Sequence, residues 1–260
     1  MSVYTVLRLV SGAIAMAALL AWQGGFSLRR LPGSWTSGLA LFAYAVAFSF
    51  AFLKLGAATG ALILFTAVQA TMIGWGLVRR DSPSLRQLAG LAIASAGFVY
   101  LLLPGLGTPD LLGTAMMIVS GVAWGVYSLR GRGALDPLAE TAGNFVRSVA
   151  FCAPLLLPSA GEAAPTLLGL GLAVVSGAVA SGLGYVVWYR ALPRLSRVQA
   201  AIVQLTVPPL AAFGAVLFLS ETLSTRLVVA AVLILAGIML AILAPAPGRT
   251  ASPAPPPASA

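Results

Sequence analysis

Long apolar runs recur along almost the whole chain, and they constrain its fold more than any other feature. Of 260 residues, 60% are hydrophobic and only 8% are charged, whereas soluble domains carry about 25% charged residues. Runs of about 20 apolar residues can cross a hydrocarbon core of about 30 Å as helices. Because lipid cannot satisfy open backbone groups and the runs lack the alternation of barrel strands, the pattern predicts an all-α, polytopic helical membrane protein.

The apolar runs correspond to about nine predicted transmembrane helices. The connections between them are short, so neighbouring helices are expected to run antiparallel, without an extramembrane domain. The final segment, residues 246–260, is rich in Pro, Ala and Ser and is predicted to be disordered. The predicted spans are 3–22, 37–53, 57–78, 87–103, 111–129, 141–158, 166–189, 198–219 and 227–244.

Basic residues gather in alternate loops, which predicts the orientation of the chain. The positive-inside rule places the arginine-rich loops, and with them the C-terminus, in the cytoplasm. The net charge of +9 is spread between spans and forms no single basic patch, so no nucleic-acid partner is predicted. The opposite loops carry only Lys54 and Arg226, and the arginine-rich set carries Arg29, Arg30, Arg79, Arg80, Arg86, Arg130, Arg132, Arg190, Arg194, Arg197 and Arg249.

The chain matches itself without gaps at an offset of 140 residues, residues 61–97 falling on residues 201–237. The informative pairs are polar residues and glycines in one register. Because the loop charges orient the two copies oppositely, the match predicts an inverted repeat, with repeats at residues 1–104 and 105–245. The matching pairs include Thr66 with Thr206, Gly74 with Gly214, Asp81 with Glu221, Ser84 with Ser224, Arg86 with Arg226 and Gly97 with Gly237.

Several motifs follow one another in a recognisable order. "LLGTAMMIVSGVAWGVYSLRGR" lies at 111–132, "NFVRSVAF" at 144–151 places an arginine early in the next helix, and "GYVVWYRALPRLSRVQAAIVQLTVPPLAAFGAVLFLSETLS" lies at 184–224. In this order they resemble the first, second, and third and fourth helices of a repeat in the EamA-type proteins of the drug/metabolite transporter superfamily. The resemblance implies ten helices in two repeats. The first repeat here shows four, so we expect either a lost first helix or a true start upstream of Met1.

Composition also restricts the chemistry of the chain. There is no histidine, and Cys152 is the only cysteine, so His-based catalytic triads, His-ligated zinc sites and disulfides are excluded. No phosphate-binding Gly-x-x-x-x-Gly-Lys-Ser/Thr loop is present. We therefore predict no cofactor, no metal and no enzymatic activity, with transport driven by a gradient or by exchange.

Polar residues inside the spans are candidates for lining a substrate cavity. Pro208 interrupts the span 198–219 and predicts a kink that frees carbonyl groups near Gln204 and Leu205. Gln69 and Gln204 are amides that need partners in lipid. Each can line a cavity, whereas a packing kink and interhelical hydrogen bonds remain open alternatives.

Aromatic pairs at helical spacing predict an aromatic-walled pocket. Tyr44, Phe48, Trp124 and Tyr185 are candidate cavity-lining residues. An interfacial aromatic belt is the alternative, and it suits Tyr127, Trp188 and Tyr189 near the cytoplasmic ends. The small residues of "SGAVASGLG" at 176–184 predict close helix packing.

Four charged residues complete the set of candidates. Arg8 and Arg147 lie about one turn inside their spans and could attract a carboxylate or form a gate, with snorkelling to headgroups as the alternative. Asp81 and Glu221 occupy equivalent turns of the two repeats, beside residue types that cap helices. We expect these two carboxylates to be structural.

Together these features predict a secondary transporter of the inner membrane, with a small organic metabolite and the lipid bilayer as partners. The substrate would be an amino acid or amphipathic compound, exported by alternating access between the repeats. A non-transporting membrane subunit or a truncated inactive homologue, and an intramembrane lipid-modifying enzyme, remain alternatives. A homodimer is left open.

Overall fold

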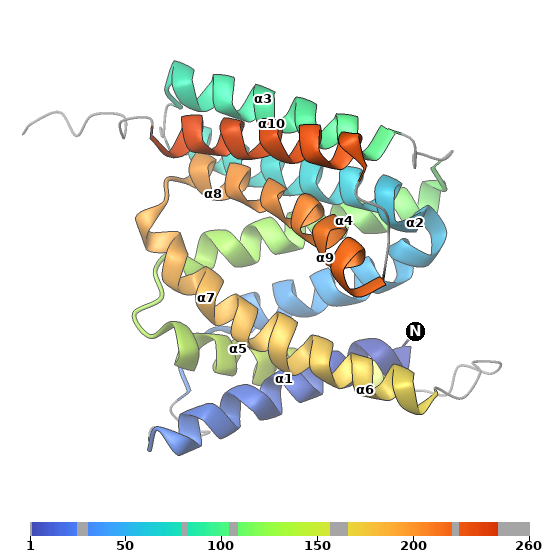
Figure 1. Ribbon diagram of the computed structural model, residues 1–260. Helices are drawn as coiled ribbons and strands as arrows, with labels where there is room; N and C mark the ends of the chain where they lie inside the picture. Colours follow the sequence, from blue (N-terminus) through green and yellow to red (C-terminus); the bar gives the residue numbers. More distant parts are fainter. Residues whose placement is uncertain are drawn as a thin grey trace, which may run out of the picture. The chain divides into compact units, whose positions relative to one another are not determined.

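A computed structural model describes residues 2–24, 31–79, 83–103, 109–156, 166–219 and 224–243 (Figure 1). Within these ranges all regular structure is helical and there is no strand, so the predicted all-α class is confirmed. The helices are α1 (Ser2–Trp22), α2 (Trp35–Val78), α3 (Leu85–Leu102), α4 (Leu111–Gly131), α5 (Pro137–Ala150), α6 (Leu167–Val175), α7 (Gly184–Ala191), α8 (Arg197–Val203), α9 (Val207–Leu219) and α10 (Thr225–Ile242).

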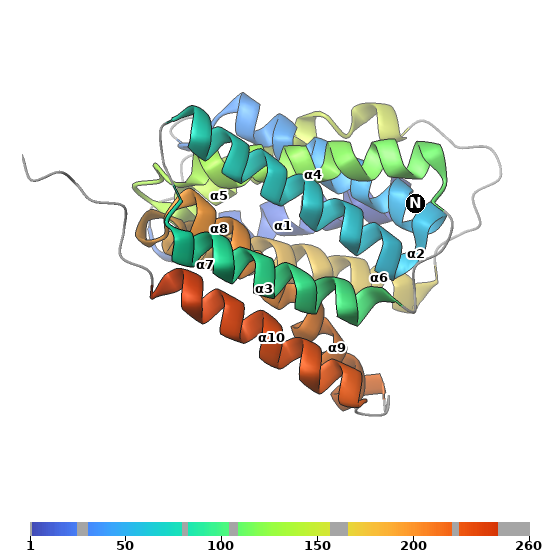
Figure 2. The same cartoon turned by 90° about the horizontal axis from the view of Figure 1, so that it is seen from above.

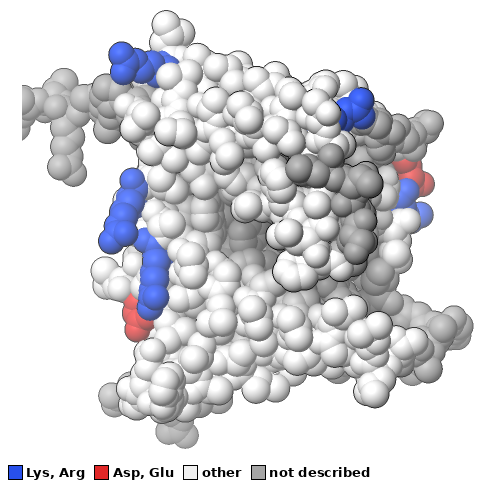
Figure 3. All heavy atoms as spheres, in the orientation of Figure 1, with Lys and Arg blue, Asp and Glu red and all other residues white. Residues whose placement is uncertain are grey.

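The exposed flanks of the helices are apolar. In the described ranges, 7 helical stretches are long and apolar enough to cross a membrane. Large side chains such as Leu111, Leu167 and Val232 are mostly exposed, and Figure 3 shows uncharged side chains covering the helix flanks on one face. A soluble protein rarely exposes such continuous apolar surface. The chain is therefore a polytopic membrane protein whose helix flanks face lipid.

Helix α2 is two membrane spans joined at Gly56. Its 44 residues would extend over about 66 Å, twice the thickness of a hydrocarbon core. Gly56 has φ 71° and ψ 174°, a region that is essentially restricted to glycine. The chain reverses there, since the end of α4 contacts Ser37 near the start of α2 and the start of α4 contacts Leu55. Further along, α4 runs parallel to the second half of α2 and reaches Thr71. This agrees with the predicted spans 37–53 and 57–78.

Two predicted spans are interrupted helices. The span predicted at 141–158 begins earlier, because Asp136 caps α5 by accepting hydrogen bonds from two backbone N–H groups, and it continues as a 3₁₀ turn, Ala153–Leu156. The span predicted at 166–189 consists of α6, a π-helical segment (Ser176–Leu183) and α7. The π-helical segment was not predicted from the sequence.

The described helices form two compact units. The first contains α1, α4, α5, α6, α7 and most of α2, and the second contains α3, α8, α9 and α10. Each unit draws helices from both predicted repeats, so the repeat boundaries at 104 and 105 stay predictions.

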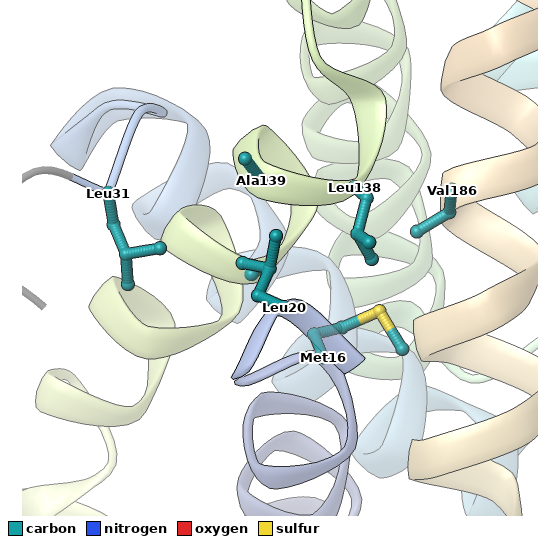
Figure 4. Close-up of a cluster of buried hydrophobic side chains, with 7 residues drawn as sticks. Met16, Leu20, Leu31, Leu138, Ala139 and Val186 are labelled. Carbon is teal, nitrogen blue, oxygen red and sulfur yellow. The ribbon is translucent and has the colours of Figure 1, made fainter. Parts of the chain in front are cut away.

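The first unit is held together where α1 packs against α5 and the π-helical segment. Apolar side chains from α1, α5, α7 and the segment before α2 form one buried cluster (Figure 4). It consists of Met16, Leu20, Leu31, Leu138, Ala139, Ala142 and Val186.

Glycines bring α1 against the π-helical segment. A Cβ atom on Gly177 would collide with the Arg8 carbonyl oxygen and the Ser11 hydroxyl, and one on Gly182 would press on Met16. The predicted close packing of the small residues at 176–184 is confirmed. This contact brings the side chains of the two elements within hydrogen-bonding distance.

In the second unit, α3 and α10 lie side by side in both views and run antiparallel (Figures 1 and 2). Gly97 contacts Ala230 and Ile234, whereas Gly237 contacts Gly90 and Ala94. When 140 is added to the residue number on α3 and subtracted from the residue numbers on α10, the contacts of Gly97 become the contacts of Gly237. The interface is thus symmetric, as a two-fold axis requires, and this symmetry is what an inverted repeat predicts.

The reversal at Gly56 can be tested by substitution. Gly56→Ala should destabilise the protein by about 1–3 kcal/mol, because alanine cannot adopt this backbone conformation without strain. The measurement is the thermal unfolding midpoint of the purified protein in detergent. Gly171→Ala is the matched control, since Gly171 is helical and a Cβ there meets no atom within 4 Å. Equal midpoints for the two variants would contradict the role assigned to Gly56.

Candidate functional site

The side chain of Arg8 is buried in the first unit, among hydroxyl groups and aromatic rings. Arg8 is only 8% exposed. Its Nε donates a hydrogen bond to the Ser181 hydroxyl at 2.9 Å, and its Nη2 donates to the Tyr185 hydroxyl at 3.0 Å. The guanidinium carbon lies 5.6 Å from the centre of the Tyr44 ring, within the range of a cation–π interaction. Arg8 therefore does not snorkel to the headgroups.

Aromatic side chains from α2, α4 and α7 meet around this guanidinium. The ring centres of Tyr44 and Trp124 are 4.9 Å apart, and those of Trp124 and Tyr185 are 4.7 Å apart. Phe48, one turn after Tyr44 on α2, adds a further ring, whose centre is 5.9 Å from that of Tyr44. The structure thus brings together four predicted cavity residues and Arg8, and we call these five residues with Ser181 the Arg8 site.

Local structure positions each member of the Arg8 site. Ser181 belongs to the π-helical segment and Tyr185 follows it by one turn, so both side chains reach α1 across the glycine contact. Ser120 on α4 donates a hydrogen bond to the Tyr44 carbonyl at 3.1 Å, which fixes α4 against the first half of α2. π-Helical turns occur frequently at functional sites, and here one aims a hydroxyl at a buried charge.

The positive charge of Arg8 has no carboxylate within 4.0 Å in the described ranges. The carboxylates described are all engaged near helix ends. Asp110 caps α4 and lies 3.7 Å from Lys54, Asp136 caps α5, and Glu140 accepts from the Leu135 N–H. A buried charge in a membrane is costly without a partner. Hydroxyl groups and a ring face compensate this one only in part.

Arg147, the other arginine predicted to attract a carboxylate or form a gate, makes different contacts. Its Nη1 donates to the carbonyl oxygens of Pro32 and Gly143, each at 2.9 Å, and its Nη2 donates to that of Leu31 at 3.1 Å. The guanidinium also lies 6.0 Å from the ring centre of Trp35. These contacts fasten the segment before α2 onto α5, so they give the half-buried Arg147 a structural role. The gating prediction for Arg147 stays untested.

The other predicted cavity residues lie outside the Arg8 site. Gln69 is half-buried, and its Nε2 has no hydrogen-bond partner. Gln204 and Pro208 belong to the second unit, where the predicted kink is a 3₁₀ turn (Gln204–Thr206) between α8 and α9. The Gln204 carbonyl accepts from the Val207 N–H, so the expectation that this carbonyl is left free is wrong.

The predicted structural carboxylates Asp81 and Glu221 lie outside the described residues. The caps of the following helices are serines, since the hydroxyls of Ser84 and Ser224 accept hydrogen bonds from Gln87 N–H and Leu227 N–H. Ser84 and Ser224 are paired by the 140-residue offset, and they cap α3 and α10. The structural role of Asp81 and Glu221 stays a prediction.

The alternative of an interfacial aromatic belt is wrong for Tyr127 and Tyr189. Tyr127 and Tyr189 are completely buried, their ring centres lie 5.0 Å apart, and Tyr127 lies 6.0 Å from Tyr185. Trp188 is half-buried and donates to the Ser128 hydroxyl at 3.0 Å. Sequence reasoning missed Ser181 as a partner of Arg8. A serine among small residues predicts packing, and only the π-helical register turns it toward α1.

No cluster of three His, Cys, Asp or Glu side chains in the described part of the chain is arranged to hold a metal ion. The donors available at the Arg8 site are hydroxyl groups and a guanidinium, which suit hydrogen bonding to an organic anion.

Helical membrane architecture and a polar, aromatic-lined centre are typical of transport proteins. The EamA-like transporter family model matches residues 111–243. This chain belongs to that family, and with it to the drug/metabolite transporter superfamily, as the sequence motifs predicted.

Three relatives and one fold neighbour are informative. An uncharacterized protein of Pseudomonas aeruginosa is 50% identical over 253 residues, covering 95% of this chain and 86% of that protein. An uncharacterized transporter of Archaeoglobus fulgidus is 30% identical over 204 residues (75% and 70%). The threonine/homoserine exporter RhtA of Salmonella typhimurium is 30% identical over 154 residues (57% and 51%). A crystal structure with 20% identity has a TM-score of 0.78, covering 92% of this chain and 86% of that one, and shares the fold.

The different contacts of the two arginines predict different consequences of their loss. Arg147→Gln should lower stability by about 2 kcal/mol, because it removes charge-assisted hydrogen bonds to the backbone carbonyls of Leu31, Pro32 and Gly143. The thermal unfolding midpoint in detergent measures this. Arg190→Gln is the control, since Arg190 is exposed on α7. An Arg147→Gln midpoint equal to that of the control would rule out the fastening role.

Proposed function

We propose that this EamA-family transporter is a secondary transporter that exports a small organic metabolite carrying a carboxylate, such as an amino acid. The observation that carries the proposal is the buried guanidinium of Arg8, placed among aromatic rings without a carboxylate partner in the described ranges. The two repeats would alternate around the site and expose it to one side of the membrane at a time.

The chemistry of Arg8 supports a carboxylate ligand. A guanidinium carries five N–H donors in a planar fork, and the hydrogen bonds to Ser181 and Tyr185 engage the Nε and Nη2 of Arg8. The remaining donors match the two oxygens of a carboxylate, and such paired bonds are strong where water is scarce. A bound carboxylate group would offset the cost of the buried charge, which a ligand without an ionised acid group would not.

The aromatic rings support a ligand with a small apolar or amphipathic body. Tyr44, Trp124 and Tyr185 offer ring faces beside the guanidinium, and Phe48 offers a further apolar surface. The exporter from Salmonella is named for threonine and homoserine, which are small carboxylates with polar side chains. That relative supports export and makes L-threonine and L-homoserine the first compounds to assay.

Loss of the guanidinium should strongly reduce transport. Arg8→Gln is expected to reduce amino-acid counterflow in proteoliposomes by 10- to 100-fold, since a charge-assisted hydrogen bond contributes about 1.5–3 kcal/mol. Arg8→Lys, which keeps the charge without the fork, should be intermediate. Ser181→Ala should be milder, because it removes one supporting hydroxyl.

Matched measurements separate this effect from misfolding. Each variant is compared at equal reconstituted abundance, with the exposed Arg190→Gln as the control. Full counterflow by a stable Arg8→Gln protein would contradict the assignment of the site. Recovery of a chemically altered compound would instead favour an enzyme.

We also propose that the protein lies in the inner membrane with its C-terminus in the cytoplasm, on the basis of the arginine-rich loops. A green fluorescent protein fused to the C-terminus should fluoresce, and alkaline phosphatase fused there should be inactive. The opposite pair of results would reverse the orientation. Fluorescence and phosphatase activity normalised to fusion abundance are the measurements.

A further inference from the structure

A polar pocket of about 360 Å³ lies at one end of the first unit. It is formed by the start of α2, the last turn of α4 and the first turn of α5. Its lining residues are Gly33, Ser34, Ser37, Arg130 and Glu140. Ser37 precedes Tyr44 by seven residues on α2, about 10 Å along the helix. The pocket is thus separate from the Arg8 site but on the same helix.

The pocket is built on a segment that is fastened to α5. Arg147 holds the carbonyls of Leu31 and Pro32, and the Asn144 side-chain oxygen accepts from the Ser34 N–H at 3.1 Å. Gly33 has φ 96°, and a Cβ there would press on that same Asn144 oxygen. Only glycine suits this position in both conformation and space. The backbone at Gly33 and Ser34, which lines the pocket, is therefore preorganised for binding.

Arg130 brings a positive charge to the pocket in a fixed orientation. Its Nε donates to the Ser37 hydroxyl at 2.9 Å, and its Nη2 donates to the Ser34 hydroxyl at 3.0 Å. The Ser34 hydroxyl in turn donates to Ser37 at 3.0 Å. This arrangement leaves guanidinium donors of Arg130 for an anionic group.

Glu140 brings a negative charge to the same pocket without neutralising Arg130. Its Oε1 accepts from the Leu135 N–H at 3.3 Å. Glu140 and Arg130 are both described and form no ion pair within 4.0 Å; Lys54 with Asp110 is the pair found in the described ranges. Two opposite charges that face one cavity separately suit a ligand that carries both charges itself.

We propose that this pocket binds a small zwitterion, with its anionic group on Arg130 and its ammonium group on Glu140. Two sources share this chemistry: a free amino acid, and the headgroup of an ethanolamine phospholipid. The volume suits either one, since ligand pockets begin at about 300 Å³. The inference concerns a second site and does not require that the Arg8 site binds substrate.

The test measures binding to the full chain in phosphatidylcholine nanodiscs with Arg8 in place, and binding that Glu140→Gln and Arg130→Gln weaken is assigned to this pocket and not to the Arg8 site. The probes are the proteinogenic L-amino acids and their N-acetyl derivatives, titrated by calorimetry. Retention of added phosphatidylethanolamine, measured by native mass spectrometry, forms the second arm. Phosphatidylcholine is the reference lipid because its quaternary ammonium cannot donate a hydrogen bond to Glu140.

The expected result is saturable binding that depends on both charges. Glu140→Gln, which keeps an acceptor for the Leu135 N–H, should weaken binding of the ammonium-bearing probe at least tenfold and leave N-acetyl derivatives unchanged. Arg130→Gln should weaken both classes of probe, and Arg190→Gln neither. If phosphatidylethanolamine is the occupant, its retention should show the same dependence on Glu140 and Arg130.

Two outcomes would overturn the proposal. One is that no amino acid binds and phosphatidylethanolamine is not retained above phosphatidylcholine. The other is binding that Glu140→Gln leaves unchanged. Because Glu140→Gln is isosteric, either outcome remains decisive even if Arg130→Gln fails to fold.

Discussion

The buried hydrogen bonds of Arg8 to Ser181 and Tyr185 are the interactions on which the first unit depends. They require α1 to approach the π-helical segment closely, which the glycines at 12, 177 and 182 permit. Breaking one partner of a buried charge leaves that charge uncompensated, and this costs more than the bond itself contributes. One guanidinium is accommodated in an apolar environment by three features. These are the close packing of α1 on its neighbours, the π-helical register of Ser181 and the aromatic rings around Arg8. Such an expense in stability is typical of functional sites within membranes.

Residues paired by the 140-residue offset share packing contacts, whereas the two arginines near the start of α1 and within α5 differ in theirs. Gly97 and Gly237 make equivalent contacts across the α3–α10 interface, and Ser84 and Ser224 cap equivalent helices. Arg8 and Arg147 do not correspond in this way, because Arg8 faces side chains at the centre of the unit and Arg147 binds backbone carbonyls before α2. Symmetry in backbone contacts alongside asymmetry in charged side chains fits a transporter that recognises an asymmetric ligand.

Features set by composition and local chemistry could be predicted from the sequence. Apolar runs predicted the spans, including the two halves of α2, and Pro208 predicted the interruption between α8 and α9. Aromatic spacing selected Tyr44, Trp124 and Tyr185, which lie together in the structure, but their contacts with Arg8 were not predicted. The π-helical register of Ser181 and the burial of Tyr127 and Tyr189 could not be predicted, because each depends on which helix packs against it. In lipid, a tyrosine near a helix end suits an interface or a buried contact equally, and pattern alone does not distinguish them.

The Arg8 site and the pocket at Arg130 are related by the helices they share. Ser37 and Tyr44 lie about two turns apart on α2, and Trp124 and Arg130 lie just under two turns apart on α4, so each helix contributes to both places. Ser120 and Arg130 fasten these helices to each other at two levels. The proposed ligand uses donors of Arg130 that its serine contacts leave free, so both fastenings of α2 to α4 stay in place when the pocket is occupied. Binding at the pocket therefore requires no change in the spacing of α2 and α4 at the Arg8 site.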